Sequence, residues 1–387
     1  MSHPGRLPWR EARHRASRAA LPLGTEEVAL DAALGRVLRQ EVTAKIDIPH
    51  YASAAMDGWA VAGTGPWRLH DGELLGAEKL GAGEAVSIVT GGLLPRGADA
   101  VVRSENARVD GDTLVLERAD GRDHIRPPAE EASAGELLVA TGTRLSPAHL
   151  ALAAAATFDR LQVALLPRVT TVFTGDEVVI SGVPDAGRVR DSFGTTVPAI
   201  LGMLGASPTR SLRIGDDRDA TVAALRDAHT ELVVTTGGTG GSHADHVRRA
   251  LDDLGAEYLV PGLASRPGGP TLLARLPDGP LVLGLAGNPL AAMLGLLSLG
   301  DVLIAGFTGR TITPLVTVPV PASVKRHPEA TRLVPVRAGL DPSTGSGRRE
   351  VEWTGAAMMR GLAAATGVLV VPPVGDAEVL PLPWTAG

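Results

Sequence analysis

Short apolar runs alternate with helix-prone stretches between residues 166 and 308, and glycine-rich loops join them. The runs RVTTVFT, ELVVTT and PLVLGLA have the composition of buried strands, and a helical pattern follows each of them. Repeated strand–loop–helix units predict a mostly parallel, doubly wound sheet with helices on both faces. The sequence therefore predicts an α/β multidomain protein with this sheet, over residues 166–310, as its central module.

Three loops follow the predicted strands: TGDE (174–177), TGGTGGSHAD (236–245) and AGNP (286–289). Ligands of open α/β sheets bind outside the carboxyl ends of the strands. Glycines there let backbone N–H groups approach an anion, and a following helix adds its positive end. Each loop alone also fits a plain turn, with Ser242 and Asp245 as a capping box. Three such loops in register favour a nucleotide-like site.

Acidic side chains gather in or near the loops of this central module. They are Asp176, Glu177, Asp191, Asp216, Asp217 and Asp245. Mg²⁺ is usually held by one or two carboxylates together with ligand phosphates, so this arrangement suits a magnesium site. The alternative is that these acids are solvated loop residues.

The flanking segments predict three further modules. Residues 1–44 with 127–165 are expected to form an elongated helical linker domain, because WREARHRASRAA, TEEVALDAALGRVLRQ and LSPAHLALAAAATF are helix-prone. Residues 45–126 alternate short apolar runs with Gly, Pro and Asp, which predicts a β-rich module. Residues 311–387 return to this pattern and predict a small β-barrel.

Composition excludes several kinds of chemistry. The chain has no cysteine, which removes thiol nucleophiles, Cys-ligated zinc, iron–sulfur clusters and disulfides. A net charge of −6 without a large basic block does not favour a nucleic-acid surface. The apolar segment 281–307 is interrupted by Asn288-Pro289 and Asp301, so it predicts a strand, a turn and a buried helix, with no membrane span. The N-terminus lacks an apolar core, so no signal peptide and a cytoplasmic protein are expected.

An ordered set of motifs resembles the molybdopterin molybdenumtransferases, the family of bacterial MoeA and the gephyrin E domain. The motifs are AMDGWAV, TGGLLPRGADAVV, EEASAGELL, FTGDEVV, GRVRDSFGTTVPAIL, TTGGTGGSHAD, RPGGP and LAGNP, from Ala55 to Pro289. The resemblance implies an elongated four-domain homodimer whose central domain is similar to molybdopterin adenylyltransferases. It also implies an Mg²⁺-dependent enzyme that inserts molybdate into adenylylated molybdopterin and releases AMP.

The resemblance also implies the site residues. Asp57, Thr90, Glu177 and Asp245 are expected to be catalytic, with Glu177 and Asp245 holding Mg²⁺. The pterin nucleotide is expected to contact Gly237, Gly238, Thr239, Gly240, Gly241, Ser242, Asp216, Arg266, Gly287, Asn288 and Pro289. Asp57 and Thr90 are expected to close the pterin and molybdate end, from the partner subunit if the protein is a dimer.

Several positions depart from the family pattern: Ala54 replaces a serine and Phe193 an asparagine, and in the Lys-Pro-Gly-Lys-Pro motif Arg266 replaces the first lysine and Gly269 the second. The Ser-x-Gly of the glycine loop is Gly240-Gly241-Ser242 here. Loss of a cation near an oxyanion removes an electrostatic contribution. Two alternatives therefore stay open beside the insertase. One is a non-catalytic paralogue that binds molybdopterin or a partner protein, and the other is a molybdopterin adenylyltransferase. A molybdopterin adenylyltransferase or a molybdoenzyme is the protein partner that the resemblance suggests.

Overall fold

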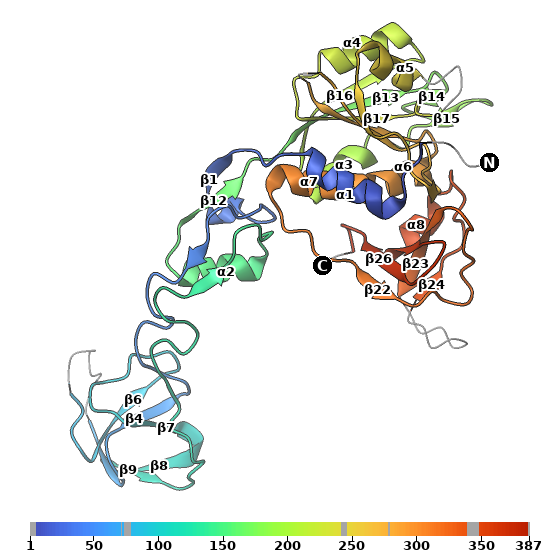
Figure 1. The fold of residues 1–387 in the computed structure, drawn as a ribbon. Coiled ribbons are helices and arrows are strands. Elements are labelled where there is room, and N and C mark those ends of the chain that lie inside the picture. The colour runs from blue at the N-terminus through green and yellow to red at the C-terminus, as the bar shows by residue number, and fades with distance from the viewer. Residues whose placement is uncertain are drawn as a thin grey trace.

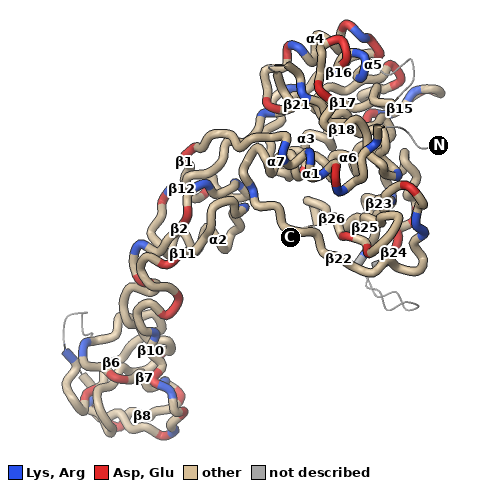
Figure 2. Tube along the Cα trace, viewed as in Figure 1, with Lys and Arg blue, Asp and Glu red and all other residues tan. Residues whose placement is uncertain are grey.

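The computed structural model describes residues 5–70, 72, 79–240, 246–277, 279–338 and 348–385. The molecule is elongated (Figure 1). An α/β module and a C-terminal β module form one end, and a small β module forms the other. A narrow linker that carries β1, β12 and α2 joins the two ends. Figure 2 shows acidic and basic residues interspersed over every part of the chain.

The α/β module is built on a six-stranded sheet of order β16-β13-β17-β21-β20-β18. The four strands from β16 to β21 are parallel, β20 pairs antiparallel with β21, and β18 pairs antiparallel with β20. Their bounds are β13 Arg168–Thr174, β16 Ser207–Ile214, β17 Leu232–Thr236, β18 Glu257–Val260, β20 Leu272–Arg275 and β21 Leu281–Leu285. The mostly parallel sheet predicted from the repeated strand–loop–helix pattern is therefore confirmed.

Helices cover both faces of this sheet. One face packs on α1 (Trp9–Ala19), α3 (Thr196–Leu204) and the continuous helix formed by α6 (Pro289–Gly295), the π-helical η3 (Leu296–Gly300) and α7 (Asp301–Thr308). The other face packs on α4 (Arg218–Arg226) and α5 (His246–Asp253). Alternate residues of each central strand enter the two cores: Leu232 and Val234 face the first, and Val233 faces the second. Burial on both faces explains why these strands are apolar throughout.

The helix from Pro289 to Thr308 is long and apolar enough to cross a membrane, and it is the one such helix in the described part of the chain. Its most apolar window is 89% buried inside the protein. Trp9 of α1 donates a hydrogen bond from Nε1 to Ser298 Oγ at 2.9 Å, and Arg13 donates to the Ser298 carbonyl at 2.6 Å. The expectation of a buried core helix is confirmed.

The linker differs from its predicted helical form at one segment. Residues 25–40 do not form a helix: Thr25–Ala29 is strand β1, and only Leu30–Ala32 makes a short 3₁₀ turn, η1. β1 pairs antiparallel with β12 (Arg160–Ala164) over all five residues, so pairing with a distant segment overrides the local helix propensity. The predicted helix at 145–158 does form, as α2 (Pro147–Ala155), and Ser146 caps it.

The linker core joins residues from both parts of the chain, among them Leu38, Val42, Val139 and Val163. Within the same linker, β2 (Val42–Thr43) pairs with β11 (Leu137–Val139). Helix α1 lies outside this core, because it packs against α7 of the α/β module. The N-terminal segment therefore bridges back to the end of the molecule that carries the large sheet (Figure 1).

The two β modules have sheets of their own. The small module has the strand order β7-β4-β6-β5-β9-β8, and β3 pairs with β10. Its elements are β3 Ser53–Ala54, β4 Gly58–Val61, β5 Trp67–Leu69, β6 Glu84–Ile88, β7 Ala100–Arg103, η2 Ser104–Asn106, β8 Ala107–Asp110, β9 Thr113–Leu116 and β10 Ile125–Arg126. The C-terminal sheet has the order β19-β23-β25-β26-β22, and β24 pairs with β23. Its elements are β19 Ser265–Arg266, β22 Val316–Val318, β23 Thr331–Ala338, β24 Arg348–Glu350, α8 Arg360–Ala364, β25 Gly367–Val371 and β26 Ala377–Pro381.

Candidate functional site

A cleft of ≈ 740 Å³ opens where β13, β17 and β21 end. All three loops singled out from the sequence line it, at 174–177, 236–240 and 286–289. Asp216, in the loop after β16, adds a fourth part of the wall. Parallel strands bring their carboxyl ends to one edge, so segments more than a hundred residues apart meet there. This volume is in the range of small-molecule sites.

The glycine loop follows β17 with a backbone that other residues would strain. Gly237 and Gly238 have φ values of +81° and +62°. A Cβ on Gly237 would lie 2.6 Å from Thr174 Oγ1, and one on Gly238 would lie 3.1 Å from the Val247 nitrogen. The glycines are therefore needed for the close approach of the loop to β13 and to the start of α5. Gly241, Ser242 and Asp245 lie outside the described residues.

One polar group of this loop is buried without a partner. The Thr236 side chain is 1% exposed, and its hydroxyl makes no hydrogen bond to any described residue. Its neighbours are fixed: the Gly237 N–H and the Thr239 hydroxyl both donate to the Leu285 carbonyl at 3.1 Å. Because a buried hydroxyl without a partner is unfavourable, Thr236 is suited to a ligand that enters the cleft.

The acids predicted near the cleft separate into two groups. Glu177 and Asp216 line it and are exposed, and their carboxylates make no hydrogen bond or ion pair to the described residues. Asp217 instead caps α4, because its Oδ1 accepts the Ala220 N–H at 2.7 Å. Asp191 accepts the Phe193 N–H at 2.9 Å and pairs with Arg213 at 2.5 Å, so its carboxylate is engaged in fixing the backbone at Phe193. Among the described acids that line the cleft, Glu177 and Asp216 are therefore the ones available to a cation, and Asp176 lies in the same loop as Glu177 but does not line the cleft.

The AGNP loop contributes an amide that does not cap its helix. Asn288 stands at the N-cap of α6 with Pro289 at the first helical position, as the sequence suggested. Its side chain, however, makes no capping hydrogen bond and lines the cleft together with Gly287. An N-cap side chain that leaves its helix unbonded has its donors and acceptors free for a ligand.

The cleft wall also contains residues outside the three loops and the predicted acids. Ala357 and Met359 of the C-terminal module line it, and so do Phe193 and Arg190. Arg190 is the basic side chain among the described lining residues. No motif pointed to Ala357 and Met359, because the C-terminal module reaches the cleft only through tertiary packing. Arg190 and Phe193 belong to the motif GRVRDSFGTTVPAIL, but neither was predicted as a site residue.

Arg266 does not line the cleft, although Pro270 of the same motif does. It lies exposed on β19, which pairs with β23. At Gly269, where a lysine of the family pattern is missing, the side chain of Arg6 occupies the space. Arg6 Nη1 lies 2.7 Å from the point that a Cβ on Gly269 would occupy.

Asp57 and Thr90 meet in the small β module. Asp57 Oδ1 accepts the Thr90 N–H at 2.6 Å and the Thr90 hydroxyl at 2.8 Å. The backbone hydrogen bond from Thr90, followed by the one from its side chain, holds the pKa of Asp57 below its usual value. Both residues are exposed. They flank β4 and β6, at the end of the molecule opposite the cleft (Figure 1), so one chain does not bring them to the glycine loop.

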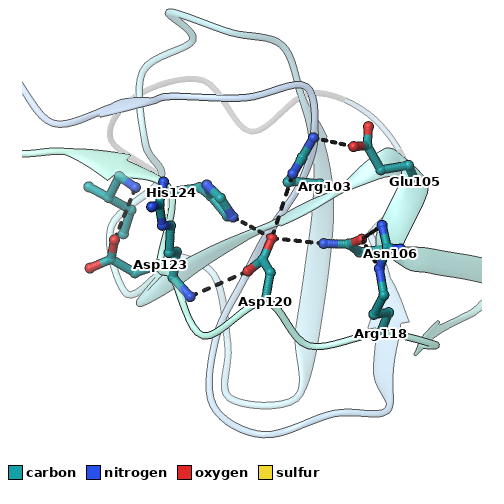
Figure 3. Close-up of polar contacts among 9 residues, drawn as sticks. Arg103, Glu105, Asn106, Arg118, Asp120, Asp123 and His124 are labelled. Atoms are coloured by element: carbon teal, nitrogen blue, oxygen red, sulfur yellow. Dashed lines mark hydrogen bonds and ion pairs between the residues drawn. The ribbon is translucent and has the colours of Figure 1, made fainter.

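Figure 3 shows a polar network around Asp120 in the small β module. The Asp120 carboxylate accepts Asn106 Nδ2 at 2.9 Å and lies 2.8 Å from His124 Nε2. The hydrogen bond with His124 is the main cause that holds the pKa of Asp120 below its usual value. The His124 carbonyl in turn accepts the Ala55 N–H at 2.8 Å. This network therefore fixes the backbone two residues before Asp57.

Comparison with known proteins decides the family. The model "MoeA N-terminal region (domain I and II)" matches residues 7–157, and "Probable molybdopterin binding domain" matches residues 170–305. The curated molybdopterin molybdenumtransferase of Bacillus subtilis (strain 168) is 32% identical over 310 residues, which cover 75% of this chain and 72% of the relative. The chain belongs to the molybdopterin molybdenumtransferase family. The curated molybdopterin molybdenumtransferase of Nostoc sp. is 31% identical over 295 residues, which cover 70% of this chain and 66% of the relative.

Solved structures show the same architecture. The molybdopterin biosynthesis moeA protein from Pyrococcus horikoshii OT3 covers 97% of this chain with a TM-score of 0.77 at 20% identity, which supports the fold alone. As a member of the molybdopterin molybdenumtransferase family, the chain is a transferase of molybdenum cofactor biosynthesis. The cleft lies within the part of the chain that matches the molybdopterin binding domain, apart from its two lining residues in the C-terminal module.

Proposed function

We propose that this protein inserts molybdate into adenylylated molybdopterin and releases AMP. The observation that carries the proposal is the cleft at the strand ends, where the glycine loop faces two acids without partners, Glu177 and Asp216. In the reaction two Mo–S bonds replace two Mo–O bonds, and the two displaced oxygens leave as water with the two thiol protons and two protons from the solvent. A further water cleaves the phosphoanhydride, which releases AMP. No oxidant or reductant is therefore needed.

The proposed substrate fits this cleft part by part. Backbone N–H groups of the glycine loop and the positive end of α5 suit the pyrophosphate. The Asn288 amide and the Thr236 hydroxyl provide polar groups without described partners. The apolar side chains of Phe193 and Met359 give the flat pterin or adenine ring a surface to pack against.

Mg²⁺ also fits the residues present. The described residues contain no group of three acidic, histidine or cysteine side chains that could hold a metal by itself. Glu177 lines the cleft, and Mg²⁺ is typically held by one or two carboxylates plus substrate phosphates. We propose that Glu177 and Asp245 hold the ion, with Asp216 near the nucleotide. When bound, the ion would neutralise charge on the phosphates.

We propose that Asp57 and Thr90 act on the cleft of a second copy in a cytoplasmic homodimer. They lie too far along the molecule to serve the cleft of their own chain (Figure 1). Apolar side chains next to them are exposed, at 68% for Val89, 46% for Leu93 and 38% for Tyr51. Exposed apolar side chains around a functional loop are typical of a surface that another protein covers. A molybdoenzyme or an adenylyltransferase remains the proposed partner for transfer of the pterin.

A single-turnover experiment tests the proposal. Purified protein is mixed with adenylylated molybdopterin, Mg²⁺ and molybdate, and AMP release is followed together with formation of the molybdenum cofactor. Both products are expected, and both should fall in Asp245→Ala. Tight binding of the nucleotide without AMP release would instead identify a non-catalytic protein. AMP release without molybdenum incorporation would contradict the insertion step.

A further inference from the structure

The N-terminal segment delivers a basic side chain to the rim of the cleft. Leu7 forms a short parallel bridge with Leu263: its N–H donates to the Gly262 carbonyl at 2.9 Å, and its carbonyl accepts the Ala264 N–H at 2.8 Å. Trp9, which is 2% exposed, anchors the following helix. The backbone on the C-terminal side of Arg6 is therefore fixed against the segment that leads to Gly269 and Pro270.

Two glycines make room for Arg6. A Cβ on Gly262 would lie 3.1 Å from Arg6 Cγ, and a Cβ on Gly269 would lie 2.7 Å from Arg6 Nη1. The aliphatic part of Arg6 thus runs along Gly262, and its guanidinium covers Gly269. The next residue, Pro270, lines the cleft. A larger residue at position 269 would displace the guanidinium from this place.

Arg248 and Arg266 lie close enough to Arg6 for their charges to act on it, and none of the three forms an ion pair with a described carboxylate. Arg248 donates from Nε to the Thr239 carbonyl at 2.8 Å and from Nη2 to the Pro261 carbonyl at 2.6 Å. These two bonds fix its guanidinium between the glycine loop and Pro261. The side chains of Arg6 and Arg266 make no hydrogen bond or ion pair to any described residue. Burial lowers the pKa of Arg6, and the charges of Arg248 and Arg266 lower it further. Like charges held together are unfavourable until an anion binds between them.

We propose that Arg6 is a substrate-binding residue that, with Arg248 and Arg266, forms a subsite for a tetrahedral oxyanion at the rim of the cleft. The inference rests on the proposed function, because both molybdate and the phosphate of the nucleotide belong to this chemical class. The planar guanidinium of Arg6 can donate two parallel hydrogen bonds to such an anion. Arg6 comes from outside the α/β module, so the N-terminal segment completes its site.

Equilibrium binding to the full chain tests the inference, with inorganic molybdate and AMP as separate probes. Arg6→Gln is expected to weaken binding roughly tenfold or more, the effect of losing a charged hydrogen bond. Arg15→Gln is the matched control, since Arg15 lies on the same N-terminal segment, is exposed and pairs with Glu11 at 2.7 Å. Unchanged thermal melting of both variants shows that the chain still folds.

A double variant that moves the positive charge from position 6 to position 269 makes the test more specific. In Arg6→Ala/Gly269→Lys the space over residue 269 is empty, and a lysine there should restore binding to within about threefold of the wild type. Loss and rescue with molybdate assign the subsite to the free oxyanion, and loss and rescue with AMP alone assign it to the nucleotide phosphate. Affinities that Arg6→Gln leaves unchanged for both probes would overturn the inference. So would a wild-type chain that binds neither.

The single-turnover experiment runs in parallel and separates the two proposals. Insertion by the wild type with unchanged anion binding in Arg6→Gln would reject the subsite and keep the function. Binding that depends on Arg6, without insertion by the wild type, would reject the function and keep the subsite.

Discussion

The α/β module and the small β module differ in how far they enclose their candidate site residues. Every residue of β17 and β21 is buried, and the loops after these strands enclose a concave cleft. In the small module three of the four residues of β8 are exposed, and Asp57 stands on an open surface. A concave site can enclose a ligand alone, whereas an exposed carboxylate needs a second surface to exclude water.

The acids of the two modules differ in the same way. Asp57 and Asp120 accept hydrogen bonds from neighbouring residues, and these bonds hold both pKa values below their usual range. Glu177 and Asp216 have no such partners among the described residues of the cleft. The small module therefore offers a fixed, ionised carboxylate, and the cleft offers carboxylates that are free to bind a cation.

The largest expected effect is loss of turnover when either region loses its acid. Glu177→Gln and Asp57→Ala should each reduce single-turnover AMP release by about 100-fold or more, which is typical for removal of a preorganised polar group. Glu130→Gln, at an exposed position of the linker, is the control and should stay near the wild type. An equal loss in the control would show a general effect of surface charge.

Mixing these two variants tests whether the regions act across subunits. Randomly paired chains of Glu177→Gln and Asp57→Ala give half mixed dimers, each with one intact site, so about a quarter of wild-type activity should return. Co-expressed chains with different tags provide the measurement. If both residues served the cleft of their own chain, every chain would carry a defect and the mixture would stay inactive.

Stability should also differ between the regions. Leu283 of β21 is 0% exposed, and Leu283→Ala should lower the free energy of unfolding by about 3 kcal/mol, because it leaves a cavity between sheet and helices. Val109 of β8 is 45% exposed, and Val109→Ala should change it by less than about 0.5 kcal/mol. Urea unfolding followed by circular dichroism measures both. Similar losses would mean that the small module contributes an equal share of the core.

The smallest effect concerns the protonation of Asp57. The folded pKa lies below the unfolded one, so the stability that Asp57 contributes is present above its usual pKa and is lost as the pH falls through the folded value. Thr90→Ala removes the hydroxyl bond and keeps the backbone bond, so the pKa should rise only part of the way to its usual value. Carbon-13 NMR titration of labelled aspartates measures the shift. An unchanged pKa would assign the effect to the backbone N–H alone.

Much of the fold followed from periodicity. The alternating pattern of residues 166–308 predicted the sheet. The apolar segment 281–307 is interrupted at Asn288-Pro289, and this predicted a strand, a turn and the buried helix that the structure has at 289–308. The failure at residues 25–40 has a physical cause. Val28 and its neighbours pair with β12, more than a hundred residues away, and this pairing leaves no trace in a local pattern.

By itself, the sequence determined which loops would carry glycines and acids, because those residue types are needed wherever a backbone approaches an anion. Only the tertiary structure decided which acids are free. Asp217 and Glu177 look alike in sequence, yet one caps a helix and the other faces the cleft. It also decided that Arg6 covers Gly269. Contacts between distant segments depend on how whole modules pack, and the packing energy is spread over many side chains that no short motif contains.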